Sequence, residues 1–143
     1  MDENLRRDIL MDNYQNPKNR ETVNDDRYLK INSNNESCID NIDIYVLYED
    51  GIIKDIRFNG EACAISTSST SIMITNLIGK TLEEAKSYVK NFENMVNEEE
   101  YDESILNEGL AYNEIYKQNN RKHCALLPYV GIKKIIAKLE EQQ

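Results

Sequence analysis

The sequence predicts an α+β fold in which a small antiparallel three-stranded sheet, a hairpin plus one further strand, packs against about five helices. Two observations predict it. Apolar and polar residues alternate over residues 42–58 on both sides of Asp50-Gly51, which is typical of a β-hairpin. Elsewhere, apolar residues recur every three or four positions, as on one face of a helix. Strands grouped together, with helices before and after them, indicate the α+β class.

Length and charge limit the organisation and the partners. The chain has 143 residues and shows no repeat or linker, so a single domain over residues 1–143 is expected. Its net charge of −9 argues against nucleic acid or an anionic membrane as the main partner, because both require a positive face. No apolar run reaches the roughly 20 residues that span a bilayer. The N-terminus MDENLRRDILMD lacks the apolar segment of a secretory signal, so a cytoplasmic location is expected.

The N-terminal half supplies the first helix and the sheet. A helix is expected over residues 1–14, and it breaks near Pro17, which disfavours helix for the residue before it. Residues 28–34 are expected to form one strand. The alternating segments 42–48 and 52–58 are expected to form the hairpin.

The C-terminal half is expected to be helical. The segment AISTSSTSIMITNLIGK, residues 64–80, predicts a helix that ends at Gly79. A capping box, Thr81-Leu82-Glu83-Glu84, opens the next helix, which runs to about Met95. The remaining elements are expected in the order 97–103 (an acidic loop or the start of a helix), around 104–116 (a helix) and about 124–140 (a helix with Pro128 in its first turns).

All three cysteines lie where predicted elements meet. Cys38 precedes the hairpin, Cys63 follows its second strand, and Cys124 lies where the last helix is expected to begin. Free cysteines are often small core residues, but those are found more often inside strands and helices. At a helix N-terminus the dipole favours a thiolate. This position therefore indicates a metal or sulfur site at Cys63 and Cys124.

Two neighbouring side chains extend this candidate site. Asp40, two residues after Cys38, would complete a tetrahedral set of three sulfurs and one oxygen, and His123 could supply a nitrogen instead of the oxygen. Alternatively, Asp40 caps a turn and His123 is an exposed residue that only tunes Cys124. The long gaps between the cysteines make their spacing a weak metal signal. The run Ser66–Ser71 is interpreted as small residues that let a helix pack closely.

Four segments together resemble a known family. ILMDNYQNPKNR, Cys38-Ile39-Asp40, GEACAISTSSTSIMITNLIGKT and RKHCALL occur in this order. They resemble the NifU/IscU family of iron–sulfur cluster assembly proteins and are most similar to its SufU branch. The resemblance covers nearly the whole chain, and the stretch around Cys63 is its most specific part. It implies a SufU/IscU-like fold.

The resemblance also implies a site and its partners. Cys38, Asp40, Cys63 and Cys124 would be the four metal-site positions. In SufU-like proteins they bind zinc, and Cys124 would accept persulfide sulfur from a SufS-like cysteine desulfurase, with Arg121 in support. In IscU-like proteins the three cysteines, with the aspartate and a histidine matching His123, hold a nascent [2Fe–2S] cluster or zinc. The chain would carry no pyridoxal phosphate of its own.

Several alternatives stay open at this point. The resemblance leaves open a cluster scaffold or a zinc-dependent sulfurtransferase, the final iron–sulfur carrier or apo-protein, and a homodimer. A non-catalytic structural zinc-binding interaction module is the alternative from another class. Two departures from the family pattern bear on the site: Ile39 stands where glycine is usual, and His123 is an IscU-like residue in a SufU-like frame. The Leu-Pro-Pro-Val-Lys segment that IscU presents to its chaperone is absent, so that partnership is not expected.

Overall fold

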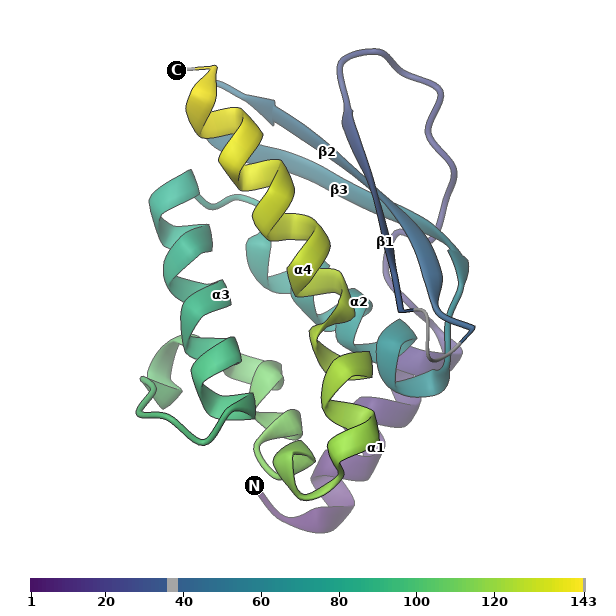
Figure 1. Ribbon diagram of the computed structural model, residues 1–143, viewed down its shortest axis with the longest axis vertical. Coiled ribbons are helices and arrows are strands. Elements are labelled where there is room, and N and C mark those ends of the chain that lie inside the picture. Colours follow the sequence, from purple (N-terminus) through teal and green to yellow (C-terminus); the bar gives the residue numbers. More distant parts are fainter. Residues whose placement is uncertain (36–38, 143) are drawn as a thin grey trace.

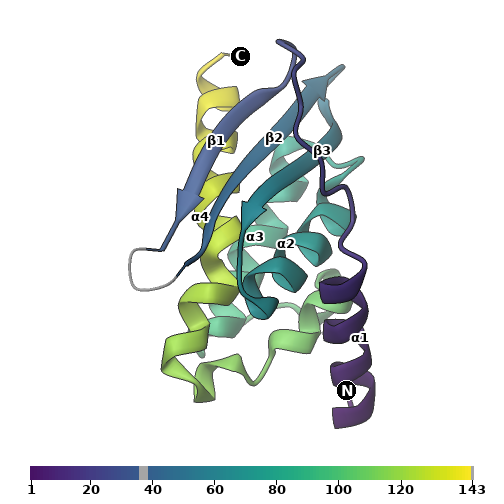
Figure 2. The same cartoon turned by 90° about the vertical axis from the view of Figure 1, so that its right-hand side faces the viewer.

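A three-stranded antiparallel sheet carries three helices on one of its faces. The computed structural model describes residues 1–35 and 39–142. The strands lie in the order β1-β2-β3, with α2, α3 and α4 behind the sheet in Figure 2, while α1 lies at one end of the molecule. The bounds are α1 Glu3–Gln15, β1 Leu29–Asn34, β2 Asn41–Glu49, β3 Ile52–Glu61, α2 Ala64–Leu77, α3 Leu82–Val96 and α4 Asn119–Glu141. The predicted fold class is confirmed.

The β2–β3 hairpin turns at the Asp-Gly pair that the sequence indicated. Glu49 pairs with Ile52, so two residues form the loop. Asp50 and Gly51 have φ angles of 56° and 78°. Positive φ at both loop positions is the conformation that matches the twist of the strands, and Asp-Gly adopts it at low cost. β1 adds to the free side of β2, with Ile31 opposite Ile44.

The segment after α1 covers part of the free edge of β3. Phe58 N–H donates to the Asn19 carbonyl at 3.1 Å, and Glu21 N–H donates to the Phe58 carbonyl at 2.8 Å. In Figure 2 this segment runs beside β3. Such pairing removes exposed backbone groups that would otherwise invite association through the edge.

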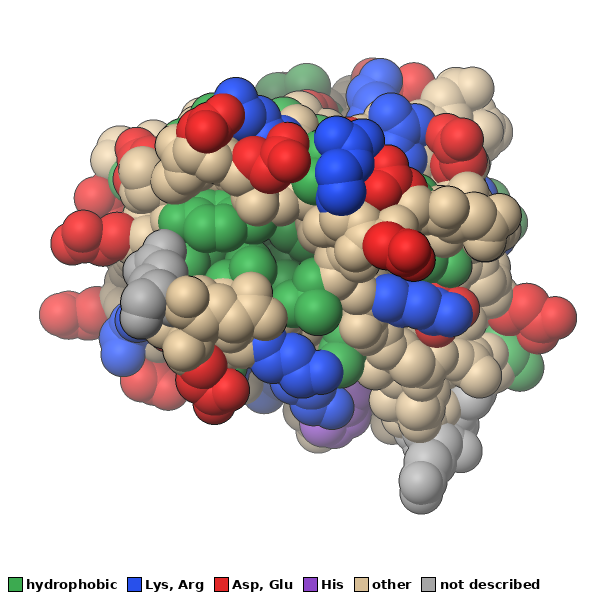
Figure 3. All heavy atoms as spheres, turned by 90° about the horizontal axis from the view of Figure 1, so that it is seen from above, with side chains coloured by type: hydrophobic (Ala, Val, Ile, Leu, Met, Phe, Trp, Pro, Cys, Tyr) green, Lys and Arg blue, Asp and Glu red, His purple; other side chains and the backbone are tan. Residues whose placement is uncertain are grey.

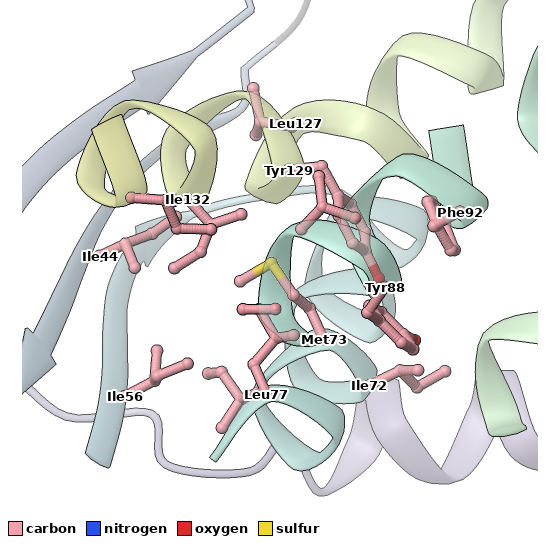
Figure 4. Close-up of a cluster of buried hydrophobic side chains, with 14 of the residues drawn as sticks. Ile44, Ile56, Ile72, Met73, Leu77, Tyr88, Phe92, Leu127, Tyr129 and Ile132 are labelled. Carbon is pink, nitrogen blue, oxygen red and sulfur yellow. The ribbon is translucent and has the colours of Figure 1, made fainter. Parts of the chain in front are cut away.

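The core lies between the sheet and the helices. Ile44 and Ile56 point from the sheet toward Met73 and Leu77 of α2 and Ile132 of α4 (Figure 4), and these side chains are completely or almost completely buried. An aromatic group joins α3 to α4, where the rings of Phe92 and Tyr129 stack with their centroids 4.0 Å apart. Burying such large apolar side chains contributes most of the favourable free energy of folding.

Both helix ends predicted on either side of Gly79 are confirmed. Gly79 follows α2 with a φ of 90°, the left-handed conformation that ends many helices. The capping box opens α3: Glu84 N–H donates to Thr81 Oγ1 at 3.1 Å, and Thr81 N–H donates to Glu84 Oε1 at 3.0 Å. Two backbone donors at the start of α3 are thereby satisfied.

Two helix predictions need correction. The expected helix around 104–116 is a series of three 3₁₀ segments, η1 Glu103–Ile105, η2 Asn107–Tyr112 and η3 Ile115–Lys117. Asn107 has a φ of 49°, which a right-handed α-helix cannot contain. The last helix begins at Asn119 rather than near Cys124. The sequence did not predict this earlier start because the first turn is almost entirely polar and exposed and shows no apolar period. Pro128 is therefore well inside α4 and not in its first turns.

The surface mixes charges of both signs. On the face seen in Figure 3, acidic and basic side chains surround a central hydrophobic hollow. None of the helices in the described ranges is long and apolar enough to cross a membrane.

Gly60 allows β3 to pass unusually close to β2 near the candidate site. Its φ of 131° lies in a region that side chains with a Cβ rarely adopt. A Cβ at this position would lie 2.3 Å from the carbonyl oxygen of Asn41, the residue that follows Asp40. Backbone atoms cannot move aside as a side chain can, so glycine is required here.

We therefore expect Gly60→Ala to lower the free energy of unfolding by about 3 kcal/mol or more, from backbone strain and overpacking together. Urea denaturation of the metal-free protein measures this. Gly51→Ala is the matched control: it also has positive φ, but its Cβ would meet nothing within 4 Å, so strain alone costs about 1–2 kcal/mol. Equal losses in the two variants would contradict the close-approach argument.

Candidate metal centre

Asp40 lies immediately before β2 and is held from two sides. Its carboxylate is almost completely buried, with 1% of the residue exposed. Oδ1 accepts a hydrogen bond from the N–H of Cys63 at 2.7 Å, and the Asp40 carbonyl accepts one from the N–H of Asn35 at 3.0 Å. The carboxylate therefore joins Asp40 to Cys63, at the start of α2. A buried carboxylate needs a donor such as this N–H, because burying a charge without one is costly.

Cys63 caps the N-terminus of α2, as the sequence predicted. Two residues after β3 ends, Cys63 adopts extended backbone angles, and its Sγ accepts a hydrogen bond from Ser66 N–H at 3.4 Å. The side chain is half-buried. This position places the sulfur at the positive end of the helix dipole, beside the backbone N–H groups of the first turn.

Cys124 occupies a different kind of position from the one predicted. It lies in the second turn of α4, is 3% exposed, and its Sγ is 3.7 Å from the carbonyl oxygen of Asn120 in the preceding turn. The effect of a helix dipole is confined to the first turn. Of the two described cysteines, Cys63 lies at a helix N-terminus as predicted and Cys124 does not.

The fold brings three of the predicted ligands together. The ligand atoms of Asp40, Cys63 and Cys124 all lie within 4.8 Å of one another, and Cys63 Sγ is 3.7 Å from Asp40 Oδ2. Two ligands of one tetrahedral zinc ion, a sulfur and an oxygen, would be about 3.5–4 Å apart given usual bond lengths. Thiolate and carboxylate are also ligand types that zinc accepts. The donor set therefore fits a zinc ion.

The other predicted site residues are placed differently. Cys38 lies outside the described residues. His123 is exposed, as is Arg121, and His123 does not belong to the group of clustered ligand atoms found among the described residues. Their predicted roles stay predictions.

Ser66 is a site residue that the sequence interpretation missed. Its hydroxyl oxygen is 2.6 Å from Asp40 Oδ2, 3.0 Å from the Cys124 carbonyl oxygen and 3.5 Å from Cys63 Sγ. The sequence did carry a signal, because Ser66 is three residues after Cys63 and the residue at this spacing lies next to a helix-capping side chain. The sequence predicts that the small residues 66–71 let a helix pack closely, and every residue of this run is buried.

The other hydroxyls near this end of α2 make structural contacts. Ser68 Oγ is 2.7 Å from the hydroxyl of Tyr112. Burial raises the pKa of Tyr112 far above its ordinary value, so its hydroxyl stays protonated and serves as a neutral hydrogen-bonding group. A pocket of about 550 Å³ between α1 and the start of α2 is lined in part by Tyr14, Ile65 and Ser68. None of the clustered ligands lines this pocket.

Comparison with known proteins assigns the chain to a family. The family described as NifU-like N terminal domain matches residues 5–138. The chain belongs to this family. It is 36% identical over 137 residues to the zinc-dependent sulfurtransferase SufU of Bacillus subtilis, covering 95% of this chain and 92% of that protein. It is 32% identical over 126 residues to the iron–sulfur cluster assembly scaffold protein IscU of Thermotoga maritima, covering 88% and 89%.

Solved structures show the same fold. FiSufU, a candidate iron–sulfur cluster assembly scaffold protein for the SUF system of Fervidobacterium islandicum, superposes with a TM-score of 0.80 at 33% identity, covering 87% of this chain and 91% of that one. The N-terminal part of a NifU-like protein from Brucella abortus has a TM-score of 0.79 at 20% identity, covering 94% of each chain. The resemblance inferred from the sequence is confirmed.

The different exposures of the two described cysteines predict different reactivities. In metal-free, reduced protein, we expect iodoacetamide to modify Cys63 several times faster than Cys124, because the reagent reaches a half-buried sulfur more easily than a buried one. Tryptic peptides separate the two cysteines for mass spectrometry. Faster modification of Cys124 would show that α4 does not keep its sulfur buried in solution.

Proposed function

We propose that this protein is an iron–sulfur cluster biogenesis factor that works in the cytoplasm. Cys38, Asp40, Cys63 and Cys124 would hold a zinc ion or the iron of a nascent [2Fe–2S] cluster, and Cys124 would accept sulfur from a cysteine desulfurase. The observation that carries the proposal is the convergence of Asp40, Cys63 and Cys124 within 4.8 Å. The relatives named zinc-dependent sulfurtransferase and cluster assembly scaffold support it.

The proposed sulfur transfer balances without an added oxidant. The Cys124 thiolate attacks the terminal sulfur of a persulfide on the desulfurase, so a new S–S bond forms on Cys124. The S–S bond of the donor breaks, and the donor cysteine leaves as a thiolate. A bound zinc ion would supply positive charge that keeps the thiolates deprotonated at neutral pH.

Burial imposes a condition on this reaction. Cys124 is only 3% exposed, so a persulfide on another protein reaches it only after the surrounding structure moves. Once Cys124 carries sulfur, the metal site needs a substitute ligand. We assign this role to His123, which is exposed and adjacent to Cys124, and a supporting role in the transfer to Arg121 on the exposed first turn of α4.

Sulfur transfer is tested with a cysteine desulfurase and free cysteine. We expect the wild-type protein to increase alanine release and to gain a persulfide sulfur, and Cys124→Ser to abolish both, because a hydroxyl cannot accept the sulfur. Mass spectrometry identifies the modified residue. Undiminished acceptance by Cys124→Ser would overturn the assignment, and no stimulation by the wild type would instead support a structural zinc module.

Metal content separates a sulfur carrier from a scaffold. For a carrier, we expect one tightly bound zinc per chain that persists during anaerobic incubation with iron and sulfide, since thiolate–carboxylate sites bind zinc strongly. His123→Ala should keep this zinc, because the exposed imidazole is only the substitute donor. Elemental analysis and visible absorption measure both metals. A stable, transferable cluster chromophore would identify a scaffold instead.

A further inference from the structure

A single buried hydroxyl lies between two of the proposed ligands. Ser66 is 0% exposed, and its Oγ is within hydrogen-bond distance of both Asp40 Oδ2, at 2.6 Å, and the carbonyl oxygen of Cys124, at 3.0 Å. A serine hydroxyl has one proton to donate. It therefore bonds strongly to one of these two acceptors at a time, and the two compete for it.

Pro128 explains why the Cys124 carbonyl is one of these acceptors. In an α-helix, the N–H of residue 128 would donate to the carbonyl of residue 124. Proline has no N–H, and its ring pushes that same carbonyl away from the helix axis. Pro128 lies inside α4, so the helix cannot supply this donor to Cys124. The Ser66 hydroxyl, from α2, is placed where it can.

The neighbouring hydroxyls show that this arrangement is specific to Ser66. Ser69, also 0% exposed, donates to the Ala125 carbonyl at 2.6 Å, which is one residue further along α4. Thr70 donates to the Ser66 carbonyl within α2 at 2.7 Å. Ser69 and Thr70 thus bond to backbone carbonyls outside the metal-ligand cluster, whereas Ser66 contacts the side chain of one ligand and the backbone of another.

We propose that Ser66 is a positioning residue that couples Asp40 to Cys124. It orients the Asp40 carboxylate toward the two sulfurs, and it holds the second turn of α4 against α2, so that Cys124 stays buried. Loss of the hydroxyl therefore removes both contacts at once. This inference rests on the proposed function for the identity of the ligands.

The test compares Ser66→Ala with Ser69→Ala. Each removes one buried hydroxyl between α2 and α4, so both should lower the free energy of unfolding by similar amounts. Only Ser66→Ala should lower zinc affinity, by about 10–100-fold, as loss of a group that orients a metal ligand typically does. Competition with a chromogenic chelator measures the affinity. Equal zinc affinities in the two variants would overturn the proposal.

A second readout needs no metal. In the metal-free protein, iodoacetamide should modify Cys124 faster in Ser66→Ala than in wild type, while Ser69→Ala should leave the rate unchanged. This measurement distinguishes failure of the proposed function from failure of the role proposed for Ser66. If the wild type binds neither zinc nor an iron–sulfur cluster, the proposed function fails, yet the alkylation rates still decide whether Ser66 holds Cys124. If the wild type binds zinc and Ser66→Ala alters neither property, only the coupling role fails.

Pro128 provides a double-mutant cycle. Pro128→Ala restores an N–H that can donate to the Cys124 carbonyl, so this carbonyl gains a donor from within α4. In the Pro128→Ala background, Ser66→Ala should therefore raise the Cys124 alkylation rate much less than in the wild-type background. Additive effects of the two substitutions would contradict the link from Pro128 through the carbonyl to Ser66.

Discussion

The close packing of α2 against α4 is the constraint on which the rest of the structure depends. Eleven of the fourteen residues of α2 are buried, and residues 66–71 of this helix are all serine or threonine. Ser66 and Ser69 donate directly to carbonyls of α4. Larger side chains would hold the two helices further apart. Because Cys63 caps α2 and Cys124 lies on α4, the separation of the helices also determines the separation of the two sulfurs.

This packing requires that buried hydroxyls find partners. A buried hydroxyl without a hydrogen bond costs about 1–3 kcal/mol, and an apolar helix of the same size would avoid that risk. Each residue of the run 66–71 makes at least one hydrogen bond through its side chain. Ser71, for example, donates to Asn13 and accepts from the N–H of Lys18, which attaches α1 to α2. The hydroxyl residues 66–71 thus give α2 specific hydrogen-bonding partners on several sides.

Local signals in the sequence predicted most of the fold. Asp50-Gly51 and the capping box at Thr81 act through contacts a few residues apart, so the hairpin and the start of α3 could be read directly. The first turn of α4 could not, because it is polar and exposed and has no apolar period. The 3₁₀ segments from residue 103 onward could not either, because tertiary contacts hold them. Gly109 illustrates this: a Cβ there would lie 2.6 Å from the Tyr88 hydroxyl, a contact between residues 21 positions apart that no local pattern reveals.

In the candidate site, too, the sequence predicted the residues that have local signals and missed those that act through distant partners. Cys63 could be placed because it follows a strand and precedes a helix, and Asp40 because it precedes the hairpin. Their convergence with Cys124 was implied only by the resemblance, since the long gaps between the cysteines carry no geometry. Ser66 could not be separated from the small residues around it, because its distinction comes from Asp40 and Cys124, which are far from it in the sequence. Pro128 shows the same limit: its effect on Cys124 depends on where α4 begins. A group that acts through partners distant in sequence becomes visible only when the fold places those partners beside it.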